Sequence, residues 1–346
     1  MRYPLGGSVL RTAGHESSGY PCEENMKRAM SRAHLLPFVL ALLLLAACNR
    51  TTKKQIAVIP MGRSHVYWAS AHAGAMKAAQ EENVDIIWNG PATEADFSGQ
   101  LQIVENMINQ HVDAIALAPI ERTALASAVD RAAAAGIPVI IWDSPVDSKN
   151  FVAQVTTDNY AAGQSAADRM GAILHGKGKV VEVAAAPGAA SSMAREQGFE
   201  DKIKHSYPGI RIVDKRFGMG DVAMSMTVAE NMLTAFPDLD AMFGSNESST
   251  VGAARALTSG KSKVKLVGFD SSPALIQGLK DGVIDSLVTQ DPFDIGYKAV
   301  KAAVSKLKGG TLERIQRLPA VVVTKDNLDD PVIHARLFPD LDRYLK

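Results

Sequence analysis

Residues 56–80, IAVIPMGRSHVYWASAHAGAMKAAQ, predict the unit from which the rest of the chain is built. The first four residues are an apolar run too short for a helix. Apolar residues from Ala69 to Ala79 then recur at steps of three and four, so the hydrophobic period changes from strand to helix. Tyr67 and Trp68 open this helix just beyond the strand. Ligands of parallel α/β sheets bind outside the carboxyl ends of the strands, so both rings are expected to face a ligand; in the alternative interpretation both are core residues.

The same alternation of strand and helix continues along the chain. It starts again near residue 180, which predicts an α/β fold of two similar lobes, each a doubly wound parallel sheet. The predicted strands are apolar throughout, as expected when helices cover both faces of a sheet. After the first strand they are expected at 84–88, 112–117, 139–142, 151–155, 180–184, 210–213, 241–243, 264–267, 284–289 and 320–323. Residues 331–346, with two prolines and scattered charges, predict an irregular surface tail.

Length and composition exclude several classes of function. A chain of 346 residues is long enough for two lobes with separate cores. Its 37 basic and 37 acidic residues balance, so no overall positive field would attract nucleic acid. Both cysteines, Cys22 and Cys48, precede the first predicted strand, so no disulfide is expected in the globular part. No histidine or cysteine cluster has metal-ligand spacing, and neither a metal nor a cofactor is predicted.

Residues 1–48 predict a targeting segment, with Met26 or Met30 as the candidate translation start. A basic flank precedes an apolar run at 35–45. This run is shorter than the about 20 residues that a membrane-spanning helix needs, and it suits the core of a signal peptide.

The end of this segment, Leu45-Ala46-Ala47-Cys48, resembles the lipobox of bacterial lipoproteins. In that motif the cysteine thiol receives a diacylglyceryl group, and the cysteine becomes the first residue after cleavage. The alternative is an ordinary signal peptide that happens to end in a cysteine. Polar residues 49–55 would then form a short tether.

Polar and aromatic residues stand just beyond the ends of the predicted strands. Carboxylates, amides and a guanidinium can bond hydroxyl groups that both donate and accept, and flat rings can pack on C–H faces, so the set suits a sugar or another polyol. An anion site would instead show glycine runs at helix N-termini or clustered Lys and Arg. The candidate ligand-binding residues are His65, Tyr67, Trp68, Asp143, Arg195, Asn246, Asp270 and Gln290.

Most of these residues also have a structural alternative. Asp143, Asp270 and Asn246 could each cap a following helix. Arg195 could form a surface ion pair with an acidic residue of its own helix, where such pairs contribute little. Taken one at a time, none of these residues decides between the two interpretations.

Together they make the chain resemble the ribose-binding branch of the type I periplasmic substrate-binding proteins, from about residue 56 to residue 323. The matching motifs stand in the family's order: Ile56-Ala57-Val58 with the aromatic pair, Ile137-Pro138-Val139-Ile140 with Asp143, Thr157-Asp158-Asn159, Ala194-Arg195-Glu196-Gln197-Gly198-Phe199, Phe243-Gly244-Ser245-Asn246-Glu247, Val267-Gly268-Phe269-Asp270, and Gln290.

The resemblance implies two lobes joined by three hinge strands, with a sugar held between them. The N-terminal lobe would comprise residues 55–157 and 291–320, and the C-terminal lobe residues 158–290 and 321–330. Tyr67 and Trp68 would pack on the sugar ring. The polar residues of the set would bond its hydroxyls.

The sequence departs from the ribose pattern at four positions. Ser144 stands where the ribose binders place an arginine, His65 stands where they place an asparagine, Gly220 replaces an aromatic residue, and Trp68 enlarges one ring. Ribose itself is therefore not the expected ligand, and a different pentose, a hexose or a cyclitol suits the pattern as well.

The expected function is capture of a sugar for an ABC importer. The protein would be a lipid-anchored, monomeric periplasmic subunit without catalytic activity, which closes around its ligand and docks on a permease of the inner membrane. A receptor of the same fold that signals to a sensor kinase or a chemoreceptor is the main alternative.

Two other classes of protein fit the sequence less well. A transcription repressor with this core would carry a helix-turn-helix of about sixty residues where this chain has the apolar leader. An enzyme could use Asp143, Asp270 and His65 as acid and base groups, but glycosidase chemistry needs carboxylates separated by about 5 to 9 Å. Separations of that kind cannot be obtained from sequence.

Overall fold

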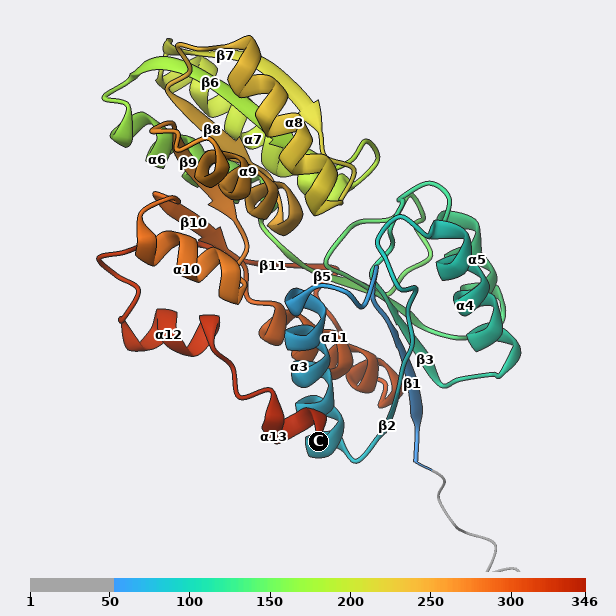
Figure 1. Cartoon of the computed structure of the whole chain (residues 1–346). Helices are drawn as coiled ribbons and strands as arrows, with labels where there is room; N and C mark the ends of the chain where they lie inside the picture. Colours follow the sequence, from blue (N-terminus) through green and yellow to red (C-terminus); the bar gives the residue numbers. More distant parts are fainter. Residues whose placement is uncertain (1–52) are drawn as a thin grey trace, which may run out of the picture. The chain divides into compact units, whose positions relative to one another are not determined.

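Residues 53–346 are described by the computed structural model, and they form two six-stranded α/β sheets (Figure 1). The first sheet has the order β11-β5-β4-β3-β1-β2, with every pair parallel. Its strands are β1 (Gln55–Ile59), β2 (Asp85–Trp88), β3 (Ala114–Leu117), β4 (Val139–Trp142), β5 (Ala153–Thr157) and β11 (Ile315–Leu318).

The second sheet repeats this order as β12-β10-β9-β8-β6-β7. Its strands are β6 (Lys177–Ala184), β7 (Gly209–Phe217), β8 (Ala241–Gly244), β9 (Lys265–Phe269), β10 (Ser286–Thr289) and β12 (Val321–Thr324). All pairs are parallel except β12 with β10, which is antiparallel. The predicted fold class of two mostly parallel, helix-flanked sheets is confirmed.

Helices cover both faces of each sheet, which explains why the central strands are apolar throughout. In β1, Ile56 and Val58 belong to one hydrophobic core and Ala57 and Ile59 to another, as expected because successive strand residues point to opposite faces. The helices beside the first sheet are α3 (Val66–Glu82), α4 (Phe97–Asn109), α5 (Ala126–Ala134) and α11 (Pro292–Leu307); those beside the second are α6 (Asn159–Ile173), α7 (Ala190–Ser206), α8 (Val222–Ala235), α9 (Glu247–Ser259) and α10 (Pro273–Asp281).

One helix pair in each lobe packs through a glycine. A Cβ atom on Gly74 of α3 would lie 1.9 Å from the carbonyl oxygen of Phe293 at the start of α11. A Cβ atom on Gly163 of α6 would lie 1.9 Å from the carbonyl oxygen of Arg195 on α7. Only glycine allows backbones to approach this closely. Gly163 thereby allows α6 and α7 to approach closely beside Arg195.

The chain passes between the two sheets three times: after β5 at residues 157–159, after β10 at residues 290–292, and between β11 and β12 at residues 319–320. The Thr157 hydroxyl donates a hydrogen bond of 2.7 Å to Oε1 of Gln290, which joins the first two crossings. We propose to divide the lobes at these crossings, with residues 55–157 and 291–320 in the N-terminal lobe and residues 158–290 and 321–330 in the C-terminal lobe.

The prediction of an irregular tail after residue 330 was wrong. The segment contains α12 (Pro331–Leu337) and α13 (Asp342–Leu345). The Asp330 carboxylate accepts hydrogen bonds from the backbone N–H groups of Val332 and Ile333, and proline is favoured at the first position of a helix because its missing N–H is not needed there. Pro331 therefore starts a helix in a segment that its prolines and scattered charges predict to be irregular.

One further element, β11, was not predicted. The β11 sequence, Ile-Gln-Arg-Leu, is half polar and occupies the edge of its sheet, so it lacks the apolar run of a central strand. The predicted leader, including Cys48, lies outside the described residues. Among residues 53–346, none of the helices combines the length and the apolar character required to span a bilayer.

Candidate functional site

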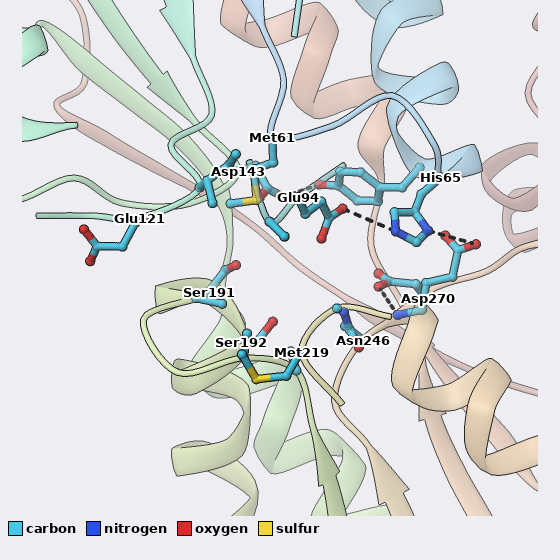
Figure 2. Close-up of a pocket in the computed structure, with 18 of the residues that line it drawn as sticks. Met61, His65, Glu94, Glu121, Asp143, Ser191, Ser192, Met219, Asn246 and Asp270 are labelled. Atoms are coloured by element: carbon cyan, nitrogen blue, oxygen red, sulfur yellow. Dashed lines mark hydrogen bonds and ion pairs between the residues drawn. The ribbon is translucent and has the colours of Figure 1, made fainter. Parts of the chain in front are cut away.

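A cavity of ≈ 300 Å³ lies at the carboxyl ends of the strands and is lined by residues of both lobes (Figure 2). This volume is at the lower end of the range for small-molecule pockets. Figure 2 shows Met61, His65 and Glu94 on one side of the cavity, and Ser191, Ser192 and Met219 on the opposite side. All eight candidate residues line this cavity: His65, Tyr67, Trp68, Asp143, Arg195, Asn246, Asp270 and Gln290.

Asp143 follows β4 directly and is buried beneath the cavity. Its backbone is left-handed, with φ 60°, a conformation that aspartate tolerates better than most residues. The Tyr67 hydroxyl donates a hydrogen bond to Oδ1 of Asp143. Burial raises the pKa of the Asp143 carboxyl, although the Tyr67 hydrogen bond and the Arg195 charge oppose this effect. The next element is β5, so Asp143 caps no helix and that alternative is wrong.

Tyr67 and Trp68 both line the cavity and belong to the core of the first lobe, so the two interpretations of these rings are compatible. The Trp68 ring packs edge-on against Tyr67, at 4.8 Å between centroids, and against Trp142, at 5.5 Å. Its Nε1–H donates a hydrogen bond of 2.8 Å to Glu94 Oε1. Packing and this hydrogen bond hold the indole in one orientation.

His65 lies between two glutamates that come from different lobes. Its Nε2 is 3.8 Å from Glu94 Oε1, and its Nδ1 is 3.8 Å from Oε1 of Glu247, the first residue of α9 (Figure 2 shows the Glu94 side). The Glu247 carboxylate raises the pKa of His65 to about 9. The charge of Glu94 acts in the same direction, and burial of the imidazole acts against both. His65 is therefore an imidazolium at neutral pH and links the two lobes by charge.

Arg195 is buried in the second lobe, with 3% of its surface exposed. Its Nε donates to Asn159 Oδ1 at 2.8 Å, and one terminal nitrogen donates to the Ser245 carbonyl at 3.1 Å. The same terminal nitrogen is 3.9 Å from Asp270 Oδ2, and the guanidinium lies 3.9 Å from the centre of the Phe269 ring. The alternative of a surface ion pair is therefore wrong for Arg195.

Asp270 and Gln290 are bonded to each other beside the hinge. Asp270 Oδ1 accepts a 2.6 Å hydrogen bond from Gln290 Nε2, and its Oδ2 accepts one of 3.0 Å from the Glu247 backbone N–H. Because Gln290 Oε1 accepts from Thr157, both ends of this amide already have protein partners. Ser272 occupies the N-cap position of α10, so the capping alternative is wrong for Asp270.

Asn246 combines two roles. It lines the cavity, and its Oδ1 accepts a 3.0 Å hydrogen bond from the Ser249 N–H as the N-cap of α9. The capping alternative is therefore confirmed for Asn246. Its Nδ2 donates to the Ser248 hydroxyl at 3.1 Å.

Several lining residues were not among the candidates. Glu94 lies in the loop after β2, and Glu247 directly follows Asn246 beyond β8, so the strand-end rule could have found both. Gly220 also lines the cavity, and a Cβ atom built on it would have no neighbour within 4 Å. The space that an aromatic side chain would occupy at this position in the ribose pattern is therefore open. The other additional lining residues include Met61, Glu121, Ser191, Ser192 and Met219.

Two helix-flanked sheets with three chain crossings, and a small-molecule cavity between them, define a solute-binding protein of the hinged two-lobe class. The family comparison agrees with this class. Residues 56–311 match the periplasmic binding protein domain, and the chain belongs to that family. Because this family consists of substrate-binding proteins, the expectation of a binding protein rather than an enzyme is confirmed.

Curated relatives and solved structures cover most of the chain. The ribose import binding protein of Bacillus subtilis is 28% identical, over 87% of this chain and 100% of the relative. The D-ribose/D-allose-binding protein of Pseudomonas aeruginosa is 31% identical, over 83% and 95%. A carbohydrate transporter solute-binding protein from Agrobacterium radiobacter, solved with D-arabinose, is 35% identical with a TM-score of 0.81, over 83% of this chain and 100% of that chain. One from Agrobacterium vitis, solved with D-fucose, is 33% identical with a TM-score of 0.79, over 82% and 100%.

Proposed function

We propose that the protein captures a monosaccharide or a related polyol between its lobes and delivers it to the permease of an ABC importer. The observation that carries this proposal is the convergence of eight candidate residues from both lobes on one cavity. Buried Asp143, Arg195 and Asp270 offer charged partners to hydroxyl groups, and Tyr67 and Trp68 offer apolar faces. The relatives that match over nearly their whole length are named as a ribose import binding protein, a D-ribose/D-allose-binding protein and a carbohydrate transporter solute-binding protein.

Ligand binding is coupled to hinge closure in this proposal. Each lobe supplies part of the site, so a ligand bridging the two parts binds the closed arrangement more tightly than the open one and shifts the population towards it. The closed form then docks on the permease. The protein acts as a monomer in the periplasm, held at the membrane by a lipid on Cys48.

The ligand differs from ribose in this proposal. Ser144 removes one guanidinium from the ribose pattern, His65 replaces an amide with a cation, and Gly220 leaves open space at one wall. These changes alter both the charge and the shape of the site. A different pentose, a hexose or a cyclitol fits them better.

A thermal-shift screen tests the proposal. Protein purified from cells expressing the full chain is melted with pentoses, hexoses, inositols and nucleosides, because a ligand that binds only the folded state raises the Tm by mass action. A rise with a sugar or a cyclitol, lost in an Asp270→Ala variant that melts normally without ligand, supports the proposal. No rise with any polyol of the panel contradicts it.

A further inference from the structure

Several polar groups that line the cavity are bonded to one another. The Gln290 and Asn246 amides each donate one N–H, to Asp270 and to the Ser248 hydroxyl, and Trp68 donates to Glu94. Each oxygen of an ionised carboxylate can accept more than one hydrogen bond. The carboxylates of the lining can therefore accept further hydrogen bonds from a ligand rich in donors.

The side chains that line the cavity include more carboxylates than cationic groups. Two side chains are cationic, His65 and Arg195, and Arg195 faces Asp270. The lining carries five carboxylates: Glu94, Glu121, Asp143, Glu247 and Asp270. If the lobes closed around a neutral sugar, this excess of negative charge would be buried without a compensating positive charge. Burial of unpaired charge is costly.

The excess of negative charge is concentrated around His65. One imidazolium faces both Glu94 and Glu247, so this group of three side chains keeps a net negative charge. Glu247 Oε2 is buried and has no hydrogen-bond partner among residues 53–346. The Glu247 side chain is 14% exposed, so bulk water reaches little of it. Burial also raises the pKa of Glu94, as expected for a carboxylate that lacks full compensation.

We infer that the ligand is an amino-substituted monosaccharide whose ammonium group binds against Glu94 and Glu247. This inference rests on the proposed function, and it names the substrate class of the same site. An ammonium group supplies three hydrogen-bond donors and one positive charge at the place where a single imidazolium faces two carboxylates. The remaining hydroxyls of the ring face Asp143, Arg195 and Asp270.

Matched ligands test this inference. Isothermal titration in mildly acidic buffer, where the amine carries its proton, compares D-glucosamine, D-galactosamine and D-mannosamine with their parent hexoses and their N-acetyl derivatives. Charge pairing in a partly desolvated site predicts that at least one amine binds about tenfold or more tightly than its parent and its neutral N-acetyl form. The parent sugar controls for the ring, and the N-acetyl form controls for the nitrogen without its charge.

Variants of the two glutamates locate the ammonium group. Glu247→Gln and Glu94→Gln each remove one charge and retain a hydrogen-bonding side chain, so either is expected to weaken binding of the amine more than binding of the parent sugar. The measured quantity is the ratio of the two affinities in each variant. Two variants are used because one of them could fold poorly, which its Tm without ligand would reveal. Glu230→Gln, at an exposed position of α8, is the matched control and is expected to keep the preference.

The outcomes separate this inference from the proposed function. A parent hexose that binds as tightly as every amine overturns the inference and leaves sugar capture standing. An amine preference that survives both glutamate variants also overturns it. Absence of binding by every amine overturns the inference as well, whereas the proposed function is contradicted only if no polyol of the thermal-shift panel binds either.

Discussion

Asp270 connects the proposed ligand site with the hinge through a single side chain. Its two carboxylate oxygens accept hydrogen bonds from Gln290, at the second crossing, and from the backbone of Glu247, and it lies 3.9 Å from Arg195. Its left-handed backbone, φ 69°, turns the residue away from the path of β9. In the proposed function, a change at Asp270 would therefore affect both recognition and closure.

We expect Asp270→Ala to weaken sugar binding by a hundredfold or more while the protein remains folded. Removing one partner of a buried charged group typically costs about 2 to 5 kcal/mol, because the other charge stays buried and uncompensated. Asp270→Asn retains the shape of the side chain and tolerates the left-handed backbone, so it separates loss of charge from loss of packing. Affinity by isothermal titration and Tm without ligand are the measurements. Normal affinity in both variants would remove Asp270 from the ligand site.

His65 gives a prediction about pH. Its pKa is about 9 in the folded protein against an ordinary value of 6.5, so folding favours the protonated form. The resulting stabilisation is complete below pH 6.5, declines as the pH rises, and is lost as the pH passes through about 9. We expect His65→Asn to lower the Tm at neutral pH and the difference from the natural protein to shrink towards pH 9. His205→Asn, at an exposed position, is the control; a constant difference across this range would contradict the ion pairs of His65.

The sequence predicted which residues line the cavity better than it predicted which of them contact one another. The strand-end rule placed all eight candidate residues around one cavity, because parallel strands bring their carboxyl ends to one edge. Whether they bind a ligand stays a prediction. The contacts of His65 with Glu94 and Glu247 depend on the distance between loops of different lobes, which no sequence period encodes.

At the scale of elements, the C-terminal segment adds a noncovalent connection between the lobes. Ile333 and Leu337 of α12 pack on the core of the second lobe, and Tyr344 of α13 contacts Phe293 at the start of α11 with 5.7 Å between ring centres. Figure 1 shows α12 below α10 and α13 beside α3. The matched family domain ends at residue 311, so this segment lies beyond it.

Arg336 of α12 joins this segment to two of the crossings. Its Nε is 3.5 Å from Asp291 Oδ2, and one terminal nitrogen donates to the Pro319 carbonyl at 3.3 Å. We expect Arg336→Leu, and deletion of residues 331–346, to lower the Tm and to weaken sugar binding several-fold, because the loss of these contacts favours other lobe arrangements. Tm and isothermal titration are the measurements, with Arg343→Leu in α13 as the control. Unchanged or tighter binding would show that the segment does not support the binding-competent arrangement.

Elements were predicted well where one physical signal dominates. Central strands such as β3 and β4 are short, fully buried apolar runs and were placed within two residues of their bounds. Helix α12 was missed because a proline can stand at the start of a helix as well as after its end. Here the Asp330 carboxylate caps the helix that begins at Pro331. Edge strand β11 was missed because most of its side chains are at least partly exposed, so its sequence is half polar and shows no apolar run.

At the scale of the whole molecule, the proposed function requires the protein to remain near its permease after it captures a ligand. The predicted lipobox at residues 45–48 supplies such a tether in the proposal. A single acyl chain holds a protein only marginally at a membrane, whereas two chains hold it stably. A diacylglyceryl group on Cys48 carries two.

We therefore expect Cys48→Ser to move the protein from the membrane fraction to the soluble fraction of the periplasm. Serine retains the size of the side chain but removes the thiol that receives the lipid, so the capture lobes and their affinity for sugar should be unchanged. Cys22→Ser is the matched control, because Cys22 precedes both candidate starts, Met26 and Met30, and should have no effect on fractionation. Immunoblots of membrane and soluble fractions, with sugar affinity measured on both variants, provide the comparison. A Cys48→Ser protein that remains at the membrane would show that the anchor lies elsewhere, and the tether in the proposed import cycle would have to be assigned to another contact.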